Sequence, residues 1–208
     1  MIDPTGVEVV VAQADACWVL ARAFTPPPAG WSFATWSEPL LADMESISDA
    51  LSLDADRLRA SVAAECARRA TLGCAQEDWL IDYSALFLVP PIAVPLNTGL
   101  LLEGTLAGTV AQQALQCYAR AGYTPSPTFR DLPDHVGMQL EFLGHLLERA
   151  AAGDAAAADD ADAFIQHFVA PWAPLLRQAC ERAQARLPAA AVYAALAYWL
   201  ECWLQARG

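Results

Sequence analysis

Helical periodicity runs through almost the whole of this sequence and restricts the folds open to it. Apolar residues recur three or four positions apart in nearly every segment, and no stretch shows the sustained alternation of a β-strand between turn signals. Prolines and glycines separate the segments. The sequence therefore predicts an all-α fold, with helices expected at about 7–24, 38–50, 54–72, 77–89, 100–121, 132–152, 160–169, 172–186 and 189–206.

The high apolar content, 56%, raises the question of a membrane protein. The longest uninterrupted apolar run extends from Pro188 to Leu200 and is closed by Glu201, and its 13 residues fall short of the roughly 20 that a spanning helix needs. The first residues carry acids and no basic cluster, so neither a secretory nor a transit peptide fits. We expect no stable membrane insertion and a cytoplasmic location.

Charge and cysteine content restrict the partners. The net charge is −12 and all 12 basic residues are arginine. Such a field repels phosphate backbones, which argues against nucleic acid, and it attracts cationic peptides. No C-x-x-C pair is present, so we expect free and mostly buried thiols at the six cysteines, Cys17, Cys66, Cys74, Cys117, Cys180 and Cys202. We expect no bound cofactor.

The segment "AAGDAAAADDAD", residues 151–162, has low complexity and is acidic. It is the best candidate in the sequence for a hinge within a single helical domain. A hinge there predicts a possible domain-swapped homodimer, in which the C-terminal helices exchange between two copies.

The stretch "FRDLPDHVGMQLEFLGHLL", residues 129–147, concentrates the polar groups that could carry chemistry. Asp131, Asp134 and His135 stand at the start of an amphipathic helix, with Glu141 and His145 further along it. Catalysis, a metal site, a helix cap and a docking surface are all open readings of this set.

The spacing of these residues separates the readings. A zinc site on one helix needs two ligands four residues apart, whereas His135 and His145 are ten apart, so no metal site is predicted. No nucleophile motif accompanies the acid and the histidine, which argues against hydrolysis. Asp131 followed by Asp134 resembles a capping box, with Pro133 tolerated in the first turn.

Several segments, taken in order, resemble the TorD/DmsD/NarJ family of redox-enzyme maturation chaperones. The first is "YSALF" with Tyr83, Leu86 and Phe87, followed by a proline-rich loop and Glu103–Gly104; then come "DLPDH" at 131–135, "FIQHFVAPW" with His167, Pro171 and Trp172, and the C-terminal "VYAALAYWLECWL". The resemblance covers about residues 75–205. It implies a TorD-like all-helical domain built as an orthogonal or up-down helix bundle.

Two departures from the family pattern stand out. Asp131 replaces the longer acid of the second motif, and its proline, Pro133, is displaced by one position. The loop Leu96-Asn97-Thr98-Gly99 stands where many members carry an aromatic residue and an acid. The first departure leaves Asp134 and His135 intact, and the second leaves open which protein such a chaperone would bind.

The resemblance implies a cytoplasmic chaperone, not an enzyme, that binds a molybdoenzyme catalytic subunit through its twin-arginine signal peptide and assists cofactor insertion and proofreading before export. Such a peptide has a cationic start and an apolar middle, so its receptor needs carboxylates beside an apolar groove. The predicted peptide-binding residues are Tyr83, Leu86, Phe87, Asp131, Pro133, Asp134, His135, Met138 and Glu141. The alternative is a small helical enzyme or ligand-binding protein that uses Asp134 and His135 in a pocket.

Overall fold

The computed structural model describes residues 4–126 and 129–207. The predicted all-α class is confirmed: this part of the chain is helical, and its only extended pairings are isolated bridges between Ser32 and Asp78 and between Asn97 and His135. Its contacts divide it into two compact units, each built from segments far apart in the sequence. None of the helices in these two ranges is both long and apolar enough to cross a membrane.

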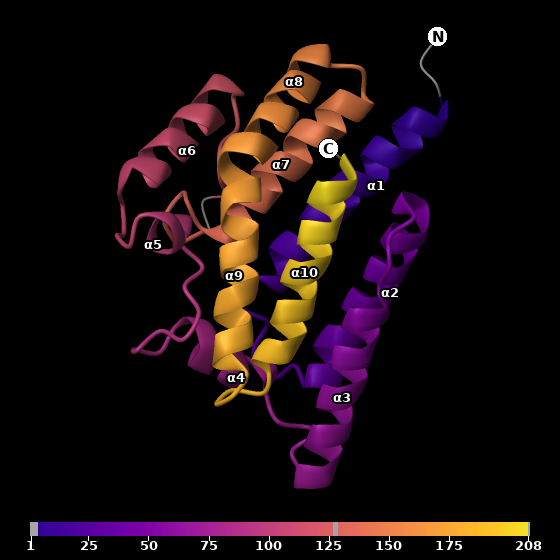
Figure 1. The fold of residues 1–208 in the computed structure, drawn as a ribbon, viewed down its shortest axis with the longest axis vertical. Helices are drawn as coiled ribbons and strands as arrows, with labels where there is room; N and C mark the ends of the chain where they lie inside the picture. Colours follow the sequence, from indigo (N-terminus) through magenta and orange to yellow (C-terminus); the bar gives the residue numbers. More distant parts are fainter. Residues whose placement is uncertain (1–3, 127–128, 208) are drawn as a thin grey trace. The chain divides into compact units, whose positions relative to one another are not determined.

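The first unit contains the described residues up to Phe24 together with Leu96–Trp172. Its helices are α1 (Pro4–Ala23), α5 (Thr98–Leu102), α6 (Thr109–Arg120), α7 (Val136–Ala151) and α8 (Ala155–Phe164), followed by the π-helical turn η1 (Ile165–Val169). Helix α7 packs against α1 and α8 (Figure 1). Gly144 allows the close approach of α1, because a Cβ atom there would lie 3.1 Å from the Trp18 indole.

The second unit contains Thr25–Pro95 and the described residues from Ala173 onward. Its helices are α2 (Phe33–Leu51), α3 (Asp56–Leu72), α4 (Trp79–Phe87), most of α9 (Ala170–Ala183), and α10 (Ala190–Arg207). Helix α3 packs against α2 and α10 (Figure 1). The Trp79 ring contacts Phe33 at 4.7 Å and stacks on Tyr193 at 6.0 Å, which places an aromatic core around the start of α4.

One predicted helix is wrong. The helix expected at 100–121 is divided into α5 and α6, because Gly104 and Ala107 take positive φ angles of 70° and 53° that no helix accommodates. The segment 151–162, expected to contain a hinge, is mostly helical and belongs to α7 and α8, with a turn at 152–154 between them. That turn is fastened by the Arg149 guanidinium, which donates to the Asp154 carboxylate and to the Ala121 carbonyl. The hinge and the domain-swapped homodimer stay predictions.

Candidate functional site

The "DLPDH" motif starts α7, although not through the expected capping box. The N-cap is His135, whose Nδ1 accepts a hydrogen bond from the Gly137 N–H at 3.0 Å. Asp131 lies before the helix, where its carboxylate accepts from the Leu132 N–H at 2.6 Å. The predicted capping role of Asp131 is therefore wrong, because the chain makes a further turn through Pro133 before the helix begins.

Asp134 is fully buried and binds the first residues of α5. Its Oδ2 accepts from the Gly99 N–H at 2.8 Å, and its backbone carbonyl accepts from the Thr98 N–H at 2.9 Å. A Cβ atom on Gly99 would stand 2.9 Å from the same carboxylate oxygen and 2.9 Å from the Thr105 carbonyl. Glycine at position 99 is thus required for this close approach of backbone to carboxylate.

The two departures from the family pattern meet in space. Asn97, from the loop, donates through its Nδ2 to Asp131 Oδ1 at 2.9 Å, and the backbones of Asn97 and His135 form a bridge. The Val136 N–H completes it by donating to the Leu96 carbonyl at 2.8 Å. Asp131, the shorter acid of the second motif, is therefore hydrogen-bonded by the side-chain amide of Asn97, which belongs to the other departure from the pattern.

A chain of buried hydrogen bonds connects Trp172, from the "FIQHFVAPW" motif, to the contact between α5 and the start of α7. Trp172 donates through its indole N–H to Gln139 Oε1 at 2.6 Å, and the Gln139 amide donates in turn to Thr98 Oγ1 at 2.9 Å. All three side chains are buried. Three segments distant in sequence are thus held together, and Gln139 is a residue of this junction that the sequence analysis did not single out.

His135 is neutral in this environment. Burial lowers its pKa from the usual 6.5, against the opposing effects of Asp131 and Asp134. The same protonation state suits its structural role, since Nδ1 can accept the Gly137 N–H only while it carries no proton. Protonation would thus remove the cap of α7 and place a charge in a buried position.

We expect acidification to destabilise the protein through His135. Because its folded-state pKa lies below the unfolded value, the unfolded chain binds the proton more readily, and stability is lost as pH falls through about 6.5. Asparagine caps helices well and does not titrate, so His135→Asn should lose less stability on acidification. Urea denaturation of both proteins at several pH values between about 7.5 and 5.5 measures the difference. Equal losses would contradict this role of His135.

Met138 and Glu141 continue α7 beyond its first turn. Met138 is buried, whereas Glu141 is half-buried and accepts a hydrogen bond from the Tyr123 hydroxyl at 3.4 Å. Burial raises the pKa of Glu141, and burial together with Glu141 raises that of Tyr123 to about 12. The described residues contain no group of three or more histidine, cysteine, aspartate or glutamate side chains arranged to hold a metal ion.

The "YSALF" motif lies on α4 in the second unit, and its three marked residues face the core. Tyr83, Leu86 and Phe87 are buried, and the Phe87 ring contacts Tyr193 edge-on at 4.8 Å. They hold α4 in place but present almost no surface to a ligand. Six of the nine predicted peptide-binding residues are buried, and Asp131, Pro133 and Glu141 are at least partly accessible. The nine are divided between the two units.

The outward face of α4 carries an open groove that the sequence analysis missed. Its volume is about 660 Å³, and it is lined by Asp78, Leu80, Ile81, Ser84, Ala85, Val89, Pro90 and Pro91. Large apolar side chains are strongly exposed here: 64% of Ile81, 56% of Val89, and about half of Leu88 and Ile92. Exposed apolar surface of this extent, bordered by polar residues, is typical of an interaction site.

Acidic residues mark the start of this groove. Asp78 caps α4, because its carboxylate accepts from the Leu80 N–H at 3.0 Å, and it also accepts from the Gly30 N–H at 2.7 Å. The neighbouring Glu77 is exposed. The groove therefore presents negative charge at the N-terminus of α4 and apolar surface along the helix and the loop that follows.

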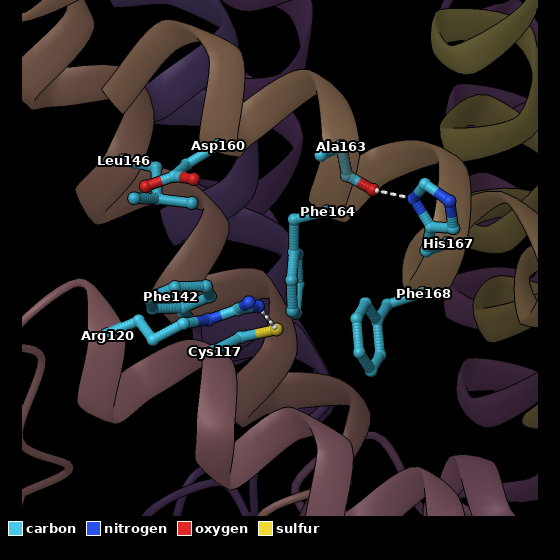
Figure 2. A pocket seen from close by; sticks show the side chains of 9 residues that line it. All are labelled: Cys117, Arg120, Phe142, Leu146, Asp160, Ala163, Phe164, His167 and Phe168. Atoms are coloured by element: carbon cyan, nitrogen blue, oxygen red, sulfur yellow. Dashed lines mark hydrogen bonds between the residues drawn. The ribbon is translucent and has the colours of Figure 1, made fainter. Parts of the chain in front are cut away.

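The first unit contains a smaller, more enclosed pocket of about 240 Å³ (Figure 2). Three aromatic rings line it, those of Phe142, Phe164 and Phe168, and the last two stack at 4.6 Å. His167, in the π-helical turn, bonds the Ala163 carbonyl at 2.7 Å, so its Nδ1 carries the proton. The pocket can accept an apolar group of phenyl size, since cavities of about 150 Å³ already hold benzene.

Comparison with known proteins places the chain in a family. No curated protein matches its sequence. A solved structure from Archaeoglobus fulgidus, described as a redox enzyme maturation protein, aligns with 93% of this chain and 93% of its own at 16% identity and a TM-score of 0.49. The family model for the nitrate reductase delta subunit matches residues 42–178. Because this match spans more than half of the chain, the protein belongs to the nitrate reductase delta subunit family, the NarJ/TorD-type maturation chaperones that its motifs resemble.

Proposed function

We propose that this protein binds the twin-arginine signal peptide of a molybdoenzyme catalytic subunit in the cytoplasm, assists cofactor insertion and retains the subunit until insertion is complete. Family membership supports the role in molybdoenzyme maturation. The net charge of −12 supports a cationic ligand, because it attracts such a peptide and accelerates its association.

The groove on the outward face of α4 is the observation that carries the proposal. A twin-arginine peptide begins with cationic residues and continues with an apolar stretch, and the groove offers the complementary order. Glu77 and Asp78 face the cationic start, and Ile81, Val89 and Pro91 face the apolar stretch. The buried motif residues Tyr83, Leu86 and Phe87 then act by fixing α4 so that this face stays exposed.

The residues of the second motif have a supporting part in this proposal. Asp134 and His135 are buried and hydrogen-bonded to backbone N–H groups, which suits positioning better than contact with a peptide. The same burial weighs against the alternative enzyme or ligand-binding role, because a substrate would have to reach an enclosed carboxylate and an enclosed imidazole. Asp131 and Glu141, which are partly accessible, remain candidates for contact with the peptide.

Titration of a fluorescent synthetic peptide tests the proposal. The peptide carries two arginines followed by an apolar stretch, and binding is followed by anisotropy. We expect Ile81→Ser to weaken binding about 10-fold, because burying an isoleucine side chain contributes about 1.5–3 kcal/mol. Leu72→Ser is the matched control, since Leu72 is also 64% exposed and in the same unit but does not line the groove.

Three outcomes separate the parts of this proposal. Weaker binding to the Ile81 variant, with unchanged binding to the Leu72 variant, supports the groove. Equal binding by all three proteins would place the peptide elsewhere on the molecule. Absence of binding to the wild-type protein would refute the role in signal-peptide recognition.

A further inference from the structure

A second groove in the same unit continues the one on α4. Its volume is about 480 Å³, and the residues that line it include Ala85, Pro91, Ile92, Arg182 and Arg186. Ala85 and Pro91 line both grooves, so their surfaces are contiguous within the second unit. The apolar surface that begins on α4 therefore leads, past Ile92, to the C-terminal end of α9.

This second groove ends in positive charge. Arg182 is in the last turn of α9 and Arg186 follows four residues later, and both side chains are exposed. Neither forms an ion pair with a residue in the described ranges, whereas Arg57 and Arg177 in the same unit both pair with Glu181. Two unpaired guanidinium groups beside apolar surface favour an anionic partner, because guanidinium binds carboxylate strongly and with defined geometry.

The charge of this continuous surface thus changes from negative to positive along its length. Asp78 lines one end, next in sequence to the exposed Glu77; apolar side chains occupy the middle, and Arg182 and Arg186 line the other end. Helix α4 has nine residues and is about 13 Å long, so an extended peptide needs about four residues or more to pass along it.

We infer that the preferred client peptide carries an acidic residue after its apolar stretch, and that Arg182 and Arg186 select for it. This inference rests on the proposed function, which requires only the cationic start and the apolar stretch. It adds a specificity determinant at the opposite end of the bound segment, with a carboxylate as the recognised group.

The overall charge of the protein predicts the opposite preference. Because the protein carries a net charge of −12, an acidic tail should weaken the binding of any peptide and a basic tail should strengthen it. A preference for the acidic tail therefore requires a local positive site, and it can be measured on the wild-type protein without any substitution.

Three synthetic peptides with the same two arginines and the same apolar stretch test the inference. They differ in ending with two glutamates, two glutamines or two lysines. We expect the glutamate peptide to bind the wild-type protein about 3- to 10-fold more tightly than the glutamine peptide, and the lysine peptide to bind least tightly. Higher salt should reduce the differences in affinity among the three peptides, because salt screens the exposed charges.

Substitution of both arginines identifies the residues responsible. In the Arg182→Gln/Arg186→Gln protein, the preference for glutamate should disappear while the glutamine peptide binds as before. Arg130→Gln is the control, since Arg130 is exposed, belongs to the first unit and makes no ion pair with a described residue. It should leave the order of the three peptides unchanged.

The outcomes distinguish this inference from the proposed function. If none of the three peptides binds the wild-type protein, the proposed function fails and the inference fails with it. If they bind but the glutamate peptide binds no better than the glutamine peptide, the inference alone is overturned. It is also overturned if the preference for glutamate persists in the double variant.

Discussion

Trp172→Ala should lower the free energy of unfolding by about 3–5 kcal/mol, the usual cost of truncating a buried tryptophan. The indole is fully buried, and its N–H donates to Gln139, which binds Thr98 in turn. Removal leaves a cavity and an unpaired buried acceptor, and both effects destabilise the fold. Urea denaturation followed by circular dichroism measures the loss.

Two further variants separate the effect of burial from the effect of the lost hydrogen bond. Trp31→Ala removes an indole that is 39% exposed, so its effect should be clearly smaller. Trp172→Phe retains most of the volume but deletes the donor, and it should cost about 1–3 kcal/mol for the unpaired Gln139 oxygen. Similar losses for Trp172→Ala and Trp31→Ala would contradict the central place of Trp172 in the first unit.

Arg69→Met should lower the free energy of unfolding by about 2–4 kcal/mol, because removing one member of a buried ion pair leaves its partner buried and charged. The Arg69 guanidinium binds the buried Glu65 at 2.9 Å and the partly exposed Asp82 of α4. It also lies over the Trp79 ring at 4.9 Å. The expected loss is held below the usual upper value for such pairs because Arg68 still binds Glu65 at 2.6 Å.

Arg59→Met is the matched control. Arg59 is on the same helix and binds Glu45 and Asp56, but it is about half exposed, and solvent screens such pairs strongly. Thermal and urea denaturation should show a small change for this variant and a large one for Arg69→Met. Equal losses of stability in the two variants would mean that burial does not determine how much these arginines contribute to the free energy of unfolding.

The sequence by itself determined the fold class and many of the helix ends. Helical periodicity, proline and glycine act within a few residues of the chain, so their effects can be read without knowledge of tertiary contacts. Gly73 ends α3 with a φ of 72°, and Gly122 follows α6 with a φ of 68°, each directly after a helix end predicted at 72 or 121. The family motifs were also visible because they are short and occur in a fixed order.

Only the tertiary structure decided which polar atoms of the motifs meet. Asp131 was expected to cap a helix, yet its carboxylate binds Asn97, a residue 34 positions earlier in the chain. Gln139 carries no motif signal in the sequence, and it is buried between Trp172 and Thr98. Contacts across such separations depend on how helices pack, and local patterns contain no information about them.

The groove on α4, at the candidate site, is another feature that local sequence patterns could not predict. This short helix is apolar around most of its circumference, so its pattern could not indicate which face is buried and which is exposed. Packing against Tyr193 buries Tyr83 and Phe87, and it leaves Ile81 on the surface. The sequence singled out this helix because its composition is local, whereas the choice of face depended on helices brought to it from elsewhere in the chain.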